Sequence, residues 1–168
     1  NPRHAVVAVT TGLLNIMEEA RAISVKKVIF ASSGGVVYGD ARKIPTSETF
    51  DPKFPLSPYG VTKLGSEYYL NFYYRTYGIP YIALRYSNVY GPRQNPESRY
   101  SLVVPAVLDK IFKNERPVID GSGNQSRDFV YVDDVLDALF KILGNKKAWG
   151  EVYNLGYGKT HSIKTLVA

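Results

Sequence analysis

The chain has 168 residues, of which 45% are hydrophobic and 21% are charged, a composition typical of a folded protein with a core of its own. It contains no cysteine, which excludes disulfides and thiolate metal sites and favours a reducing, cytoplasmic location; we expect no metal site. The net charge is +6, but the basic residues are scattered, and this argues against nucleic acid, whose binding surfaces are usually clustered stripes. No apolar run approaches the roughly 18 residues of a membrane span, so we expect no membrane segment.

Both ends of the sequence have the character of a cut made within something longer. The chain opens at Asn1, and apolar residues recur at helical spacing from Val7 to Ile23, which predicts a helix. Residues 163–168 at the other end are typical of a helix that has just begun. We therefore expect one domain, or one and a half lobes, of a larger protein.

The next elements alternate between strand and helix. A short apolar run over residues 28–31 predicts a strand buried on both faces, and it ends in Ser32-Ser33-Gly34-Gly35. A polar, proline-rich loop over residues 40–58 leads to a long helix over residues 57–77. We expect a serine N-cap and a proline in the first turn of this helix, and a glycine, Gly78, to end it.

A second buried strand over residues 81–85 completes an alternation of helix and strand that is typical of a parallel α/β sheet. The pattern of the sequence changes near residue 90, where we expect a second lobe to begin. The elements predicted after that point are a helix over residues 103–113, a strand over 117–119, a Gly-Ser-Gly turn at 121–123, a strand over 128–132, a helix capped by Asp133 and ending at Leu143, and a strand over 152–155.

Tyr59 and Lys63 form a Tyr-x-x-x-Lys pair in the first turns of the predicted long helix. Their spacing of four places both side chains on one helical face, beside a strand end of the kind where α/β sheets bind ligands. A tyrosine base at neutral pH needs its pKa lowered by about 3 units, or about 4 kcal/mol. An ammonium about 4 Å away supplies about that much at an effective dielectric near 20. We interpret the pair as a base with its activating lysine; the alternative is a half-buried ring and a solvated ammonium.

Two further segments carry hydrogen-bonding side chains at predicted strand ends. Ser32 and Ser33 leave the first strand, where their hydroxyls can bond a substrate hydroxyl and the glycines after them allow close approach; a plain strand-to-helix turn is the alternative. Residues 84–93 run from the second strand into a loop rich in hydrogen-bonding groups.

A fourth segment surrounds Arg127, which flanks the predicted strand over residues 128–132. The planar guanidinium of an arginine suits a diphosphate, although a surface salt bridge is the alternative. For Asp133 and Asp134 we favour helix capping over a role in chemistry.

Taken in this order, the four segments resemble the extended short-chain dehydrogenase/reductase family of NAD-dependent nucleotide-sugar epimerases and dehydratases, with the UDP-sugar 4-epimerases as the most similar branch. The similarity runs from the first helix to Asn154-Leu155-Gly156. It implies an α/β fold: the C-terminal half of a Rossmann-type parallel sheet with helices, plus part of a small α/β substrate-binding lobe. Residues 1–90 would be the second half of the NAD-binding domain, and residues 91–168 a partial nucleotide-sugar-binding lobe with the remaining Rossmann strand and helix.

The resemblance also implies a role for each candidate residue. Tyr59 would be the base on the sugar hydroxyl, Lys63 would lower its pKa and bind the nicotinamide ribose of NAD, and Ser33 would assist at the same hydroxyl. The reaction would be epimerisation of a UDP-sugar at C4, in which hydride passes to NAD and returns to the other face of the ketone. The cofactor contacts would be Ser32, Ser33, Tyr59, Lys63, Tyr86 and Ser87, and the substrate contacts would be Asn88, Val103 and Arg127.

The chain departs from the family pattern at several points. Counted back from Tyr38-Gly39, the family's serine or threonine position falls on Gly34, so Ser32 is the alternative to Ser33. The glycine-rich turn that binds the cofactor's pyrophosphate precedes the matched region, and Gly121-Ser122-Gly123 cannot replace it because a strand follows. We therefore expect the chain alone to be an inactive fragment.

Two alternatives to an epimerase remain. Gly35 and Val36 stand where the 4,6-dehydratases carry an acidic pair, which favours an epimerase, but a decarboxylase or reductase of the same family is the runner-up. The chain is otherwise a fragment that binds UDP-sugar without turnover or pairs with a partner.

The resemblance further implies a homodimer through the helices over residues 5–22 and 57–77, which form a four-helix bundle in relatives. Aromatic residues lie on more than one face of the second helix, which fits a core side and a partner side; core packing alone is the alternative. These residues are Tyr68, Tyr69, Phe72 and Tyr73.

Overall fold

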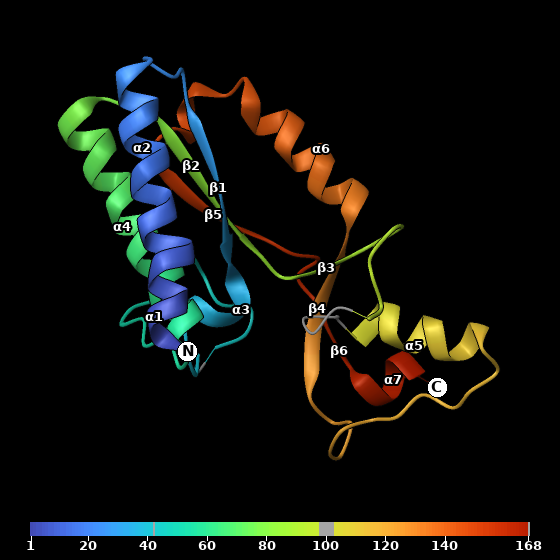
Figure 1. Cartoon of the computed structure of the whole chain (residues 1–168). Coiled ribbons are helices and arrows are strands. Elements are labelled where there is room, and N and C mark those ends of the chain that lie inside the picture. The colour runs from blue at the N-terminus through green and yellow to red at the C-terminus, as the bar shows by residue number, and fades with distance from the viewer. Residues whose placement is uncertain (42, 98–102, 168) are drawn as a thin grey trace. The chain divides into compact units, whose positions relative to one another are not determined.

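The structure is a computed structural model that describes residues 1–41, 43–97 and 103–167. The chain divides into two compact units (Figure 1). Unit 1 comprises Asn1–Tyr86 and Ile142–Leu155, and unit 2 comprises Ser87–Lys141 and Gly156–Ala168.

Unit 1 is built on a parallel sheet of three strands. These are β1 (Val28–Ser33), β2 (Tyr81–Tyr86) and β5 (Glu151–Leu155), in the order β1-β2-β5. The central strand β2 is buried almost throughout, as its apolar run predicted. Ser33 pairs with Tyr86 in the register, so β1 and β2 end level with each other. The segments that follow the two strands therefore start from one edge of the sheet.

A long helical segment opens unit 1. It consists of α1 (Pro2–Ala5), the π-helical η1 (Val6–Thr11) and α2 (Gly12–Ala22), and it runs as one continuous rod in Figure 1. Helix α4 (Pro58–Tyr77) contacts all three parts of this rod. Apolar side chains from α2, α4 and β2 with its preceding turn form the core between these elements, namely Leu13, Met17, Leu70, Tyr73, Ile79, Tyr81 and Ala83.

The predicted caps of α4 are confirmed. The Ser57 hydroxyl accepts a hydrogen bond from the Gly60 amide at 3.0 Å, and Pro58 is the first helical residue. Gly78 ends the helix in the left-handed conformation, with φ of 70°, which glycine adopts without steric cost.

A short helix that the sequence did not predict, α3 (Gly34–Val37), follows β1 directly. At four residues it is too short to show a helical period. A loop then leads from Tyr38 to Ser57, and a 3-10 turn, η2 (Lys146–Ala148), precedes β5.

The described part of unit 2 contains three short strands in the order β3-β4-β6. β3 (Asn88–Tyr90) and β4 (Ser126–Tyr131) are parallel, whereas β6 (Thr160–Ser162) is antiparallel to β4. The helices α5 (Val103–Phe112) and α7 (Ile163–Val167) contact each other.

Two predictions for this region are wrong. Residues 115–120, all described, contain no strand, and Val118 in the predicted strand is 82% exposed; without a neighbouring strand to pair with, its apolar run does not form one. Helix α6 (Val132–Leu143) begins one residue before Asp133. Asp133 therefore lies in the first turn, where the helix dipole favours an acidic residue, and is not the cap.

None of the helices within the described ranges combines the length and the apolar character needed to cross a membrane.

Candidate active site

Tyr59 and Lys63 meet near the carboxyl end of β1. Tyr59 is the second residue of α4, and Lys63 follows one turn later. The Lys63 ammonium nitrogen lies 5.5 Å from the centroid of the Tyr59 ring and 4.7 Å from that of Phe30. It donates a hydrogen bond to the carbonyl oxygen of Ala31 at 2.6 Å. The helix thus presents a phenol and an ammonium together beside the strand.

Burial shifts the pKa values of both groups. Partial burial raises the pKa of Tyr59, whose residue is 45% exposed, and burial lowers the pKa of Lys63. The raised pKa of Tyr59 is opposite in direction to the one that the resemblance implies. The physical reason is that burial disfavours the charged phenolate, while the Lys63 ammonium donates to the Ala31 carbonyl oxygen.

The two serines at the end of β1 have different environments. Ser32 is buried, and its hydroxyl donates to Glu67 Oε1 at 2.5 Å. Ser33 is half-buried at the N-terminus of α3, and its side chain makes no capping hydrogen bond. Tyr86 pairs with Ser33 across the sheet, and burial raises the pKa of its phenol. Ser33 is therefore the serine whose hydroxyl remains for a ligand at this edge.

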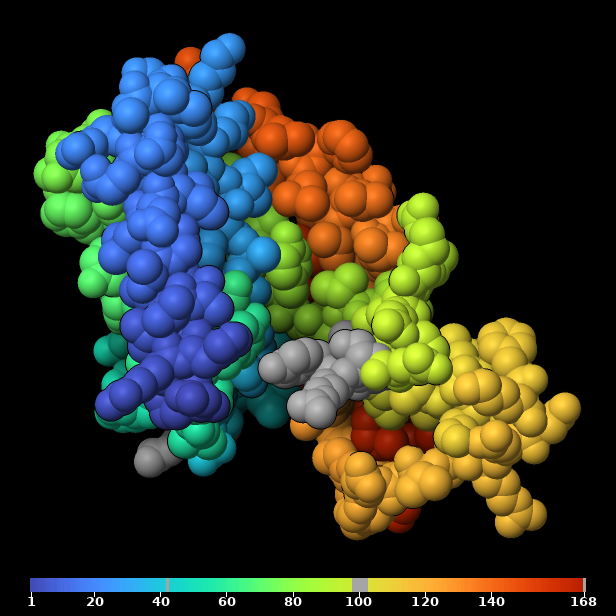
Figure 2. Space-filling view, viewed as in Figure 1, coloured from blue at the N-terminus to red at the C-terminus, as the bar shows by residue number. Residues whose placement is uncertain are grey.

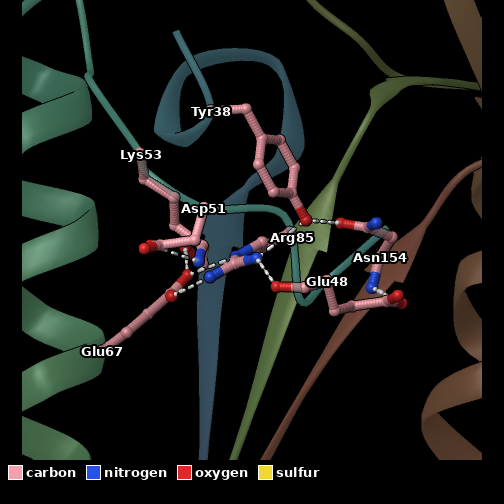
Figure 3. A network of polar contacts seen from close by, with 8 residues as sticks. Tyr38, Glu48, Asp51, Lys53, Glu67, Arg85 and Asn154 are labelled. Atoms are coloured by element: carbon pink, nitrogen blue, oxygen red, sulfur yellow. Dashed lines mark hydrogen bonds and ion pairs between the residues drawn. The ribbon is translucent and has the colours of Figure 1, made fainter. Parts of the chain in front are cut away.

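A buried ion pair that was not predicted from the sequence lies on the same face of α4. Arg85, in the middle of the sheet, donates from Nε and Nη2 to the two carboxylate oxygens of Glu67 at 3.0 and 2.6 Å. The side chains of Arg85 and Glu67 are 3% and 5% exposed, and Figure 3 shows their charged ends facing each other. Burial acts to lower the pKa of Arg85, but hydrogen bonds to Glu67 and the charge of Glu67 raise it overall.

The ion pair continues into a wider network (Figure 3). Arg85 Nη1 donates to the Tyr38 hydroxyl at 2.7 Å, and that hydroxyl donates to Asn154 Oδ1 at 2.6 Å. Asn154 in turn holds the loop before α4, because its Nδ2 donates to the Thr46 carbonyl and its backbone amide donates to a carboxylate oxygen of Glu48, both at 2.8 Å. The network therefore links β1, β2, β5, α4 and the loop.

In unit 2, two of the predicted residues converge on Asp128. The Ser87 hydroxyl donates to Asp128 Oδ1 at 3.3 Å, and the Asn88 amide donates to the Asp128 carbonyl oxygen at 3.0 Å. The Asp128 carboxylate also accepts from the backbone amides of Tyr157 and Gly158 at 2.8 and 2.7 Å. Asp128 was not predicted as a site residue, although its neighbour Arg127 was.

Arg127 and Val103 do not join this cluster. The guanidinium of Arg127 is exposed and donates to the carbonyl oxygen of the adjacent Ser126 at 2.8 Å. Within the described residues it forms no salt bridge, so the surface ion pair that was the alternative to a diphosphate role is not found there. Val103 is half-buried at the start of α5.

The residues present fit one end of a nicotinamide dinucleotide. Lys63 and Ser33 offer donors at the strand ends, and Gly35 has open space where a side chain would begin. A pyrophosphate, by contrast, needs a glycine-rich turn that opens a helix of several turns. Among the described residues the turn after β1 opens only the four-residue α3, and the glycine turn at 121–123 leads into β4.

Comparisons with known proteins agree on one family. The model of the NAD dependent epimerase/dehydratase family matches residues 1–156. A putative UDP-glucose 4-epimerase of Methanocaldococcus jannaschii is 47% identical over 155 residues, which are 92% of this chain and 49% of that protein. The chain thus spans about half the length of the curated relatives it matches.

Two solved structures are similar over nearly the whole chain. One is a UDP-glucose 4-epimerase of Thermotoga maritima with UDP-glucose, at 39% identity and a TM-score of 0.92, covering 99% of this chain and 53% of that one. The other is a UDP-glucose 4-epimerase of Thermus thermophilus in complex with NAD, at 36% identity and a TM-score of 0.82, covering 93% and 50%. The predicted Rossmann-type α/β fold and the predicted family resemblance are confirmed.

Proposed function

Because the chain belongs to the NAD-dependent epimerase/dehydratase family, we propose that it carries the tyrosine–lysine part of the active site of a UDP-sugar 4-epimerase. The observation that carries this proposal is the placement of Tyr59, Lys63 and Ser33 at the carboxyl end of one strand of a parallel sheet. Relatives that act on UDP-glucose by name support the choice of substrate class.

In the proposed reaction, the Tyr59 phenolate takes the proton of the C4 hydroxyl as hydride leaves the same carbon, which becomes a ketone. Ser33 donates a hydrogen bond to the reacting oxygen. NAD, when bound, supplies the reversible hydride acceptor. Tyr59 then returns the proton to the oxygen after hydride has come back to the opposite face of the ketone, so the chain's own groups move only the proton.

The raised pKa of Tyr59 means that the phenolate needs help from Lys63. The lysine side chain is flexible enough to leave the Ala31 carbonyl and approach the phenol oxygen. At about 4 Å and an effective dielectric near 20 the attraction is about 4 kcal/mol, equivalent to about 3 pKa units. We expect ligand binding to draw Lys63 towards Tyr59 in this way.

For unit 2 we propose the nucleotide end of the substrate. The exposed Arg127 guanidinium has no carboxylate partner among the described residues and suits the diphosphate, while Asn88 and Val103 would contact the nucleotide-sugar. Tyr86 and Ser87 would lie near the nicotinamide, and Ser32, whose hydroxyl bonds Glu67, would contribute backbone.

The decisive test uses a completed chain, in which both ends are extended with the corresponding segments of the Methanocaldococcus jannaschii relative. Tyr59→Phe in this completed chain should lower turnover of UDP-glucose by several orders of magnitude, because the base is lost. Tyr69→Phe, on the same helix, is the matched control and should leave turnover near wild type. Near-wild-type turnover of Tyr59→Phe would show that Tyr59 is not the base.

The 168-residue chain by itself should form no UDP-galactose from UDP-glucose even with added NAD; measurable product would contradict this. It should bind UDP weakly, and calorimetry should show that Arg127→Ala abolishes this binding whereas Arg116→Ala, another exposed arginine, does not. Equal affinity of both variants would remove Arg127 from the diphosphate site.

A dehydratase, decarboxylase or reductase of the same family is the alternative function. A dehydratase needs an acid and a base where this chain has Gly35 and Val36, both in α3. Release of a 4-keto-6-deoxy sugar by the completed chain would favour that alternative over the epimerase.

We also propose that the epimerase is a homodimer through the rod of residues 2–22 and α4. The rod lies on the face of unit 1 seen in Figure 2, and Val7, Ile16, Tyr68 and Phe72 on these helices are exposed. Sedimentation of the completed chain should show a dimer that Tyr68→Glu dissociates, while Phe112→Glu, on an exposed apolar residue of unit 2, should not. A dimer that survives Tyr68→Glu would place the interface elsewhere.

A further inference from the structure

Three polar residues of α4 share one face because they are spaced four apart: Tyr59, Lys63 and Glu67. Lys63 donates to the carbonyl oxygen of Ala31 at 2.6 Å, and Glu67 accepts from the hydroxyl of Ser32 at 2.5 Å. Ala31 and Ser32 are adjacent residues of β1. Consecutive turns of the helix are therefore joined to consecutive residues of the strand.

Arg85 holds the second of these joints rigidly. Its two hydrogen bonds reach both oxygens of the Glu67 carboxylate, and such a paired geometry fixes direction as well as distance. Its remaining nitrogen bonds the Tyr38 hydroxyl at 2.7 Å. Glu67 consequently cannot slide along β1 without breaking charged hydrogen bonds in a buried setting, which is costly.

The first turn of α4 is also closely seated. A Cβ atom on Gly60 would lie 2.6 Å from the carbonyl oxygen of Val36 in α3, a distance that real side chains do not tolerate. Tyr59 precedes this contact by one residue. The position of Tyr59 therefore depends on how α4 is seated against α3, which follows β1 directly.

We infer that Glu67 and Arg85 are positioning residues that set the register of α4 on β1 and thereby hold Tyr59 and Lys63 in place. The pairing of Lys63 with β1 stands on the contacts alone, whereas the catalytic meaning of the Tyr59–Lys63 pair rests on the proposed function. A misplacement of about 1 Å costs on the order of a hundredfold in rate, so a register device of this kind matters to turnover.

A purely structural ion pair makes a different prediction. Replacement of a buried ion pair by apolar residues often preserves or increases stability, but it removes the directional bonds. The double variant Glu67→Met with Arg85→Met therefore separates the two roles. It also leaves the net charge near Lys63 unchanged, because one charge of each sign is removed.

The first experiment titrates Lys63 by NMR in the 168-residue chain, with its signal assigned through Lys63→Arg. Burial lowers the pKa of Lys63 where its ammonium donates to the Ala31 carbonyl; in the folded double variant α4 can shift and expose Lys63, so we expect that pKa to rise towards the ordinary value of about 10.4. Met17→Ala, in the core but remote from the network, is the control for destabilisation and should leave it lowered. A Lys63 pKa that is unchanged in the folded double variant would overturn the inference.

If the double variant does not fold, Ser32→Ala decides, since it removes the hydroxyl that joins Glu67 to β1 and keeps the ion pair. We expect the pKa of Lys63 to rise in this variant too, by less than in the double variant. An unchanged pKa would overturn the inference.

The second experiment measures turnover in the completed chain. The folded double variant should lose on the order of a hundredfold in kcat with KM for UDP-glucose nearly unchanged. Full kcat in this variant while Tyr59→Phe is inactive would overturn the positioning role and leave the proposed function intact. Absence of turnover in the unsubstituted completed chain would overturn the proposed function, and the Lys63 titration would still test the register.

Discussion

Each unit holds a buried or half-buried carboxylate, and the two are satisfied in different ways. Glu67 in unit 1 meets a guanidinium from another element, and both side chains are almost fully removed from water. Asp128 in unit 2 is half-buried and meets two backbone amides and a hydroxyl. In the first case each charge requires the other, whereas in the second a single charge is held by groups that remain neutral.

This difference decides how each unit responds to substitution. Removal of one member of the unit 1 pair leaves the other charge without a partner in a low-dielectric interior. Removal of the unit 2 charge leaves backbone amides that can still donate hydrogen bonds to water or to the oxygen of a neutral side-chain amide. Two polar clusters with similar sets of hydrogen bonds therefore differ in how much stability is lost when one member is replaced.

The largest expected effect is that of Arg85→Ala. It leaves the Glu67 carboxylate buried without a cation, and we expect the free energy of unfolding of unit 1 to fall by about 3–5 kcal/mol. Urea denaturation followed by tryptophan fluorescence measures this, because Trp149 lies in unit 1. A loss below about 1 kcal/mol would mean that the two units do not differ in the way described.

Asp128→Asn tests the other side of the comparison and should cost about 1–3 kcal/mol, since the charge-assisted bonds to two amides weaken. Hydrogen exchange of the Tyr157 and Gly158 amides, read by NMR, should increase with it. Asp109→Asn, which removes an exposed i,i+4 pair with Lys113, is the control and should cost about 0.5 kcal/mol or less.

High pH should act on unit 1 through Tyr73. Burial, with help from its hydrogen bond to Glu18, raises the pKa of Tyr73 to about 12, against about 10 in an unfolded chain. The folded state favours the neutral phenol more strongly than the unfolded chain does. The contribution of Tyr73 to the free energy of unfolding is therefore complete below pH 10 and is lost as pH rises from 10 through 12. Tyr73→Phe should remove this part of the pH dependence. The difference in free energy of unfolding between the wild type and Tyr73→Phe should therefore narrow from pH 10 to pH 12, and a constant difference would contradict the assignment.

The smallest expected effect is that of Arg127→Ala on stability. Its side chain is exposed and, among the residues that the structure describes, bonds only the adjacent carbonyl oxygen, so the free energy of unfolding should change by no more than about 0.5 kcal/mol. A larger loss in thermal unfolding would mean that Arg127 supports unit 2 and would weaken its assignment to a ligand.

Much of the fold was predictable because its long elements have strong local signals. α4 shows a serine cap, a proline in the first turn and a terminal glycine, and β2 is a continuous apolar run; both predictions are confirmed. The short elements α3, β3 and β6 have no period to detect. The apolar residues at 117–119 predicted a strand wrongly because strand formation depends on a pairing partner that sequence alone does not reveal.

The candidate site was predictable only in part. Tyr59 and Lys63 lie four residues apart, so helical geometry brings them together from sequence alone. Glu67 and Arg85 belong to different elements, and only the folded sheet reveals their pairing. Two weak signals existed: a glutamate eight residues after Tyr59, and an arginine inside an otherwise apolar strand. A buried charge in such a strand requires a partner of opposite charge, and α4 carries that partner, Glu67.

The loop before α4 begins and ends at nearly the same place. Gly39 has φ of 66°, and a Cβ atom there would lie 2.0 Å from the carbonyl oxygen of Phe54. The two stems of the loop therefore touch, and its middle, at Thr46 and Glu48, is held to β5 through Asn154. Between the first stem and that anchor, Lys43 and Ile44 are exposed.

A loop with closed stems and an exposed segment accepts foreign sequence easily, because an insertion there changes neither the spacing of the stems nor the buried contacts. An affinity tag or a small reporter domain inserted beside Lys43 should extend outward and leave Thr46 and Glu48 at their anchor. The same addition placed after Glu48 would pull on the anchor itself, so this one loop offers both a tolerant and an intolerant insertion point for engineering.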